Sequence, residues 1–133
     1  MQATAQAIPV SNVSLWSGRI ITALVILFML VDGGIKVTNL APAVEGTARL
    51  GYPVSLVVPI GIVALGCTLL YAIPKTAILG AILLTGYLGG ATATQVRLQD
   101  PWFFFPVLIG ALAWLGIFLR DEQLRALIPL RRS

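Results

Sequence analysis

The 133-residue sequence contains no histidine and a single cysteine, Cys67. Histidine is the most common metal ligand and a frequent general base, so its absence removes the usual basis for both roles. One cysteine cannot form a disulfide within the chain. The composition therefore predicts no metal site and argues against a zinc, haem or copper centre held by this chain alone.

Charged residues are also scarce. They make up 11% of the chain, whereas 58% of its residues are hydrophobic; typical soluble domains carry about 25% charged residues. A soluble fold of this size cannot cover so much apolar surface, so we expect the lipid bilayer to be the solvent. The net charge of +4 then indicates membrane topology and contact with lipid head groups, and no nucleic-acid partner is predicted.

Four apolar stretches are long enough to span a bilayer, which takes about 20 helical residues. We expect an all-α, integral membrane four-helix bundle over residues 15–119, with an N-terminal tail at 1–14 and a basic tail at 120–133. A short interfacial helix is expected between the first two spans, because Pro42 suits its start and Gly51 its end. The predicted spans are about 16–37, 53–73, 76–97 and 101–119. Cleavage of the first span as a signal peptide is the less favoured alternative, because no basic residue precedes it.

The third predicted span carries no charge from Thr76 to Val96 and has small residues at helical spacing. Inside a bilayer, strips of small residues are the usual packing surface between helices. We therefore expect this span to be the helix around which the others pack. The predicted packing residues are Ala81, Thr85, Gly86, Gly89 and Gly90.

An even number of spans puts both termini on one side of the membrane. Six of the nine Lys and Arg residues fall on that side and three on the other. Basic residues concentrate on the cytoplasmic side of membrane proteins. Both termini are therefore expected in the cytoplasm, with the basic tail against anionic head groups.

Polar residues gather at the opposite end of the spans. Asp32 and Lys36 lie four residues apart within the first span and can pair, and Glu45 and Arg49 are expected to form a second, interfacial pair. Ionisable residues within a span are candidates for function because they are unfavourable there unless paired or hydrated. The alternatives are that both pairs only orient helix ends, and that Tyr87 is a packed aromatic residue. The candidate ligand-binding residues are Asp32, Lys36, Tyr87, Gln95 and Arg97.

Three stretches resemble the DoxX-like family of small bacterial membrane proteins: LGYP from Leu50, LLYAIPKTAILGAILLTGYLGGATATQVR from Leu69, and LRDEQLRALIP from Leu119. The resemblance covers most of the chain and implies a four-helix bundle in the bacterial plasma (inner) membrane. The wider family includes subunits linked to quinone-coupled oxidation of sulfur compounds and to membrane redox complexes. In the family pattern, Glu is frequent at the position of Ala64 and His at that of Gln95, so the resemblance does not imply enzymatic activity for this chain alone.

Two classes of function follow. The favoured one is a non-catalytic accessory or partner-binding subunit of a membrane complex, with no cofactor, in contact with another membrane protein or a second copy of itself. The alternative is a quinone-binding membrane subunit of an oxidoreductase system, with the quinone near Asp32, Tyr87, Gln95 and Arg97. A transporter or channel is least favoured, because polar groups at one end give no continuous polar route.

Overall fold

The computed structural model describes residues 10–131; the first nine residues of the predicted N-terminal tail and the last two residues of the basic tail lie outside this range. The described chain is helical and contains no strand. Its long helices are α1 (Asn12–Val37), α3 (Val57–Ala72), α4 (Ala77–Arg97) and α5 (Phe104–Arg120). The shorter elements are α2 (Ala41–Arg49), α6 (Glu122–Leu127) and the single 3-10 turns η1 (Val54–Leu56), η2 (Pro74–Thr76) and η3 (Pro101–Phe103).

Four helical stretches of the described chain are long and apolar enough to cross a membrane, namely 12–37, 54–72, 74–97 and 101–120. This confirms the predicted all-α bundle of four spans, and α2 confirms the short helix between the first two. The first helix begins within the expected tail, at Asn12. Ser11 caps it there, because the Ser11 side chain accepts a hydrogen bond of 3.1 Å from the backbone N–H of Ser14.

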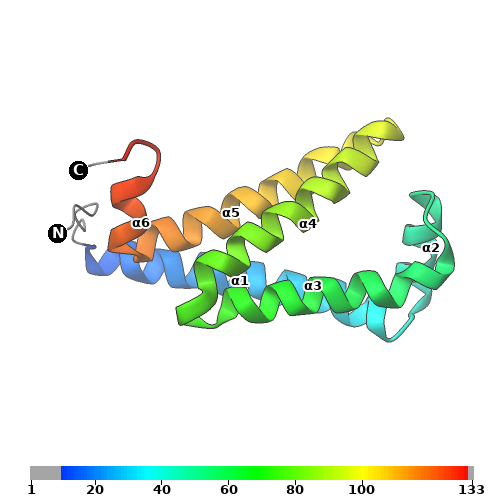
Figure 1. Cartoon of the computed structure of the whole chain (residues 1–133), viewed down its shortest axis with the longest axis horizontal. Helices are drawn as coiled ribbons and strands as arrows, with labels where there is room; N and C mark the ends of the chain where they lie inside the picture. The colour runs from blue at the N-terminus through cyan, green and yellow to red at the C-terminus, as the bar shows by residue number, and fades with distance from the viewer. Residues whose placement is uncertain (1–9, 132–133) are drawn as a thin grey trace.

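The four long helices form a ring in which α1 packs against α3 and α5, and α4 packs against the same two helices. Figure 1 shows α1 beside α3 along one side of the molecule and α4 beside α5 along the other. The expectation that the third span is the helix around which the others pack is thereby corrected, because α1 holds an equivalent place in the ring.

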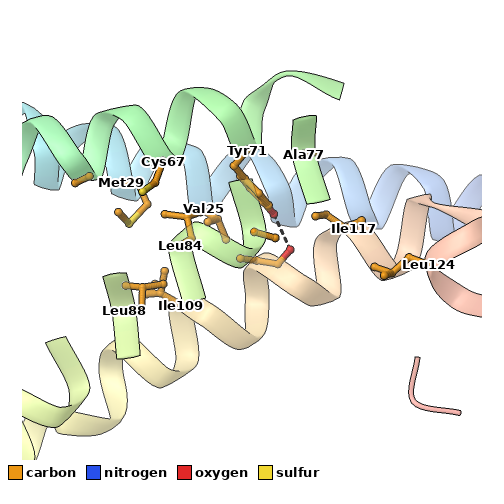
Figure 2. Packing of buried hydrophobic residues seen from close by; sticks show 13 residues of the cluster. Val25, Met29, Cys67, Tyr71, Ala77, Leu84, Leu88, Ile109, Ile117 and Leu124 are labelled. Atoms are coloured by element: carbon orange, nitrogen blue, oxygen red, sulfur yellow. Dashed lines mark hydrogen bonds between the residues drawn. The ribbon is translucent and has the colours of Figure 1, made fainter. Parts of the chain in front are cut away.

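The core of the bundle is apolar and draws side chains from all four long helices (Figure 2). Tyr71 of α3 is fully buried, and its hydroxyl donates a 2.7 Å hydrogen bond to the carbonyl oxygen of Ala113 on α5. This bond satisfies a polar group that would otherwise be unfavourable in the core. The residues labelled in Figure 2 are Val25, Met29, Cys67, Tyr71, Ala77, Leu84, Leu88, Ile109, Ile117 and Leu124.

Glycines allow close approach of the helices at the end of the bundle where α1 begins and α5 ends. A Cβ atom on Gly18 of α1 would lie 2.6 Å from the carbonyl oxygen of Gly116 on α5. A Cβ atom on Gly80 of α4 would overlap the backbone of Tyr71 on α3. Backbone therefore contacts backbone at both places, as expected for small residues between membrane helices.

The structure corrects the predicted packing strip on α4. Ala81 is fully buried, and Thr85 accepts a 2.7 Å hydrogen bond from the Trp114 indole of α5. The rest of the strip, Gly86, Gly89 and Gly90, is exposed, and no atom of the described chain lies within 4 Å of a Cβ built at any of the three. These glycines make no close helix contact within residues 10–131.

The helices separate toward the end of the bundle that carries α2. In Figure 1, α3 and α4 start side by side at their connection, and α4 then rises away from α3 along its length. At this end α1 stays close to α3, because a Cβ on Gly61 of α3 would meet the Cβ of Lys36 at 2.7 Å. The space between the diverging helices forms the candidate site.

Candidate functional site

Two clefts lie between the diverging helices. The first, which we call the aromatic cleft, has a volume of about 480 Å³ and is lined by α1, α4, η3 and the start of α5. The second, the glycine cleft, has a volume of about 490 Å³ and is lined by α1, α2, η1, α3 and α4. Both volumes lie within the range of small-molecule sites. The residues that line both clefts are Asp32, Lys36, Leu50, Tyr87 and Ala91.

Asp32, Lys36 and Tyr87 form a closed ring of hydrogen bonds between α1 and α4, which we call the polar triad. The Lys36 Nζ atom lies 2.9 Å from Asp32 Oδ2 and donates to the Tyr87 hydroxyl at 2.8 Å. The Tyr87 hydroxyl in turn donates to Asp32 Oδ2 at 3.1 Å. The pairing of Asp32 with Lys36 is thus confirmed, and Tyr87 extends it across the bundle.

The local sequence of α1 and α3 explains how Lys36 reaches the triad. Gly61 leaves room on α3 for the first methylene of Lys36, so the apolar stem of the lysine lies against the helix surface. Its ammonium group then turns toward α4, with the Lys36 side chain 18% and the Asp32 side chain 26% exposed. The charged groups are held against the protein yet remain accessible from the clefts.

Aromatic side chains form the walls of the first cleft beside the polar triad. Phe28 of α1 and Phe105 of α5 lie edge to face, with ring centroids 5.2 Å apart and an interplanar angle of 65°. Trp102 and Gln95 also line this cleft. Aromatic walls of this kind favour a flat, apolar ring as occupant, and Gln95 is a polar residue in the lining of the same cleft.

The glycine cleft has a different lining. Gly86 and Gly90 of α4 form one wall, and Ile60 of α3 lies on the other. Because these two glycines carry no side chain, the cleft remains open where α3 and α4 separate. Two of the glycines predicted to pack against a helix therefore line a cleft instead.

Three contacts tie α2 and the loop after it to the end of α4 and the loop that follows α4. Arg49 lies 3.2 Å from the Asp100 carboxylate, Arg97 donates to the Leu50 carbonyl oxygen at 3.3 Å, and the hydroxyls of Tyr52 and Thr94 are 2.9 Å apart. The predicted pair of Glu45 with Arg49 is therefore corrected, because the ion-pair partner of Arg49 is Asp100.

Asp100 directly precedes the last span and is held as a carboxylate. The Trp102 backbone N–H donates to it at 2.9 Å, and this bond, followed by the Arg49 guanidinium, keeps the pKa of Asp100 below its usual value. A lowered pKa means that the contact is present at neutral pH and is lost only as the pH falls through that lowered value. The link between α2 and η3 therefore persists in mildly acidic conditions.

The five candidate residues from the sequence do not all meet. Asp32, Lys36 and Tyr87 are in direct contact, and Gln95 lines the aromatic cleft with them. Arg97 is exposed and hydrogen bonds to the loop after α2. Within the described residues, no group of three or more His, Cys, Asp or Glu is placed to hold a metal ion.

The family model described as the DoxX-like family matches residues 20–116. The chain belongs to the DoxX-like family. The matched stretch includes every residue that lines the two clefts of this DoxX-like protein. Together with the four apolar helices, it identifies a membrane protein. Neither a curated protein nor a solved structure matches the chain.

Proposed function

We propose that this DoxX-like protein is a non-catalytic membrane subunit that binds a quinone-type ligand in the aromatic cleft. The observation that carries the proposal is the polar triad, which places charged hydrogen-bonding groups in a cleft between membrane-spanning helices. Ionisable side chains in such a position are typical of ligand and proton sites.

The charges of the triad favour a neutral head group. The Asp32 carboxylate and the Lys36 ammonium compensate each other, so the cleft presents no net charge to its occupant. A lysine ammonium has three N–H groups, and Asp32 and Tyr87 accept two of them. The third N–H, together with the Gln95 amide, suits a ligand carbonyl oxygen.

The lining and size of the cleft fit the ring of a quinone. Phe28, Phe105 and Trp102 provide apolar walls, and the polar triad lies at one side of the same space. A bound quinone would supply two-electron redox chemistry. In this proposal the chain itself binds and orients the ring, and the partner subunits of a membrane complex supply the electrons.

Replacing Gln95 with leucine tests this assignment. The variant removes the amide and keeps a side chain of similar size, so affinity should fall about fivefold, as for one lost hydrogen bond of about 1 kcal/mol. The probe is a benzoquinone ring with a ten-carbon alkyl tail, titrated into lipid nanodiscs that hold the protein, with empty nanodiscs as the reference.

Gln123→Leu is the matched control, because Gln123 is exposed on α6, at the other end of the bundle. It should bind the probe as the wild type does. Equal affinities of the Gln95 and Gln123 variants would count against the proposed site, as would a wild type that binds no more probe than empty nanodiscs.

We also propose that the bundle end with α6 faces the cytoplasm. Ser14 of α1 donates a 2.5 Å hydrogen bond to the Leu119 carbonyl oxygen of α5, so the first and last spans meet at this end. Among the described residues, this end carries five basic and two acidic side chains, and the opposite end carries three of each. An excess of Lys and Arg is typical of the cytoplasmic side.

Reporter fusions after Ser133 check this orientation. A green fluorescent protein fused there should fluoresce, and an alkaline phosphatase fused at the same residue should be inactive, because the phosphatase folds only outside the cytoplasm. The reverse pattern would place the basic end outside and refute the orientation.

A further inference from the structure

We infer that the glycine cleft carries the apolar tail of the ligand from the polar triad into the lipid, between α3 and α4. The inference rests on the proposed function and names the ligand class of the same site. That class consists of a neutral head group with acceptor oxygens joined to a long apolar chain.

The two clefts adjoin each other at the polar triad. Asp32, Lys36 and Tyr87 line both of them, as do Leu50 and Ala91. A head group beside Phe28 and Phe105 is therefore already at the boundary of the glycine cleft. A chain attached to that head group would pass beside the triad to enter the second cleft.

The glycine cleft reaches the surface of the bundle at the depth of the hydrocarbon. Gly86 and Gly90 lie eleven and seven residues before Arg97, the last residue of α4, which corresponds to about 16 and 10 Å along the helix. Both glycines are exposed. A chain that leaves the bundle here meets lipid tails rather than water.

Polar groups line the end of the cleft near α2. The hydroxyls of Tyr52 and Thr94, 2.9 Å apart, join the loop after α2 to α4, and Thr47 of α2 also lines this end. An apolar chain placed at this end would displace water from these polar groups, which is unfavourable. Its favourable direction is therefore toward Ile60 and the two glycines, where the lining is apolar.

An open path accounts for two glycines that helix packing does not explain. Glycine is a poor helix former, and a Cβ at Gly86 or Gly90 would meet no atom of the described chain within 4 Å. The neighbouring Gly89 is equally open but lines neither cleft. This difference provides a matched pair of sites for a test.

The experiment compares two probes in nanodiscs, a benzoquinone ring without a tail and the same ring with a ten-carbon tail. Gly90→Leu places a branched side chain in the glycine cleft. It should weaken binding of the tailed probe at least tenfold relative to the wild type and leave the tailless probe unchanged. Gly86→Leu is a second variant with the same expectation, and Gly89→Leu should change neither affinity.

The outcomes separate this inference from the proposed function. Wild-type affinity of both glycine-cleft variants for the tailed probe would overturn the tail path and leave the head-group site standing. An equal loss of both probes would also overturn it, because the obstruction would then act on the head group. A wild type that binds neither probe above empty nanodiscs would contradict the proposed function and the tail path together.

Discussion

Gly80→Ala is expected to lower the thermal stability and the folded yield of the protein sharply. The added methyl group would overlap the backbone of Tyr71 and Leu70, which cannot move aside without separating α3 from α4. Closely packed interiors do not absorb such an overlap, and overpacking commonly destabilises by about 1–3 kcal/mol, occasionally more. We expect the destabilisation of this variant to lie at the upper end of that range, because the clash is with backbone rather than with a flexible side chain.

Gly89→Ala is the matched control on the same helix. Gly89 is exposed, and a Cβ there would meet no atom of the described chain within 4 Å. Alanine is also the better helix former by about 1 kcal/mol, so this variant should unfold at the wild-type temperature or above. The measurement is the unfolding temperature of both variants in the same detergent. Equal unfolding temperatures would contradict the close contact of α3 with α4.

Lys36→Met is expected to destabilise the protein by about 3 kcal/mol, at the lower end of the range for a broken buried ion pair because both groups are partly exposed. The methionine at position 36 keeps an unbranched side chain that packs against Gly61. The Asp32 carboxylate, however, is left between membrane-spanning helices without its cation. The unfolding temperature should fall clearly. Lys75→Met is the control, because Lys75 is exposed in the turn between α3 and α4.

The double variant Asp32→Leu, Lys36→Met should recover most of the lost stability. No charge is left unpaired in it, and replacing a whole buried ion pair with apolar side chains is often neutral or stabilising. A double variant as unstable as Lys36→Met alone would show that the lysine acts through packing and not through the charge of Asp32. A single variant with wild-type stability would show that the pair contributes nothing to the fold.

The spans and the helix between the first two could be predicted from the sequence because the bilayer imposes a length and an apolar composition on each of them. The pair of Asp32 with Lys36 could be predicted because both residues lie on one helix, where a spacing of four fixes their proximity. Tyr87, the third member of the triad, could be named as a candidate from the sequence, but its contacts with Asp32 and Lys36 could not be predicted. Tyr87 meets them only through the way α1 and α4 face each other across the ring.

The packing glycines could not be identified from spacing alone. Gly80 and Gly90 both lie on the same helix among small residues, yet one touches backbone and the other borders a cleft. The difference depends on where α3 and α4 approach each other and where they separate, which helical periodicity does not encode.

Arg49 gives a second example of a partner set by tertiary structure. Glu45 is its neighbour at the favoured spacing on α2, but Asp100 lies 3.2 Å away from another part of the chain. The sequence also did not predict Phe28 as a cleft residue. Its neighbours in the first span are apolar on every face of the helix, so no pattern distinguishes the face that lines the cleft. Aromatic residues of η3 and α5 that line the same cleft were the available indication in the sequence of an aromatic site.

The most direct test of the proposed binding site is a titration of the ten-carbon-tailed benzoquinone into nanodiscs that hold the wild type or the folded Asp32→Leu, Lys36→Met variant. We expect each wild-type chain to bind one molecule above the level of empty nanodiscs, and the double variant to bind no more than empty nanodiscs. Equal binding by the two proteins, or no binding by the wild type, would contradict a ligand site at the polar triad.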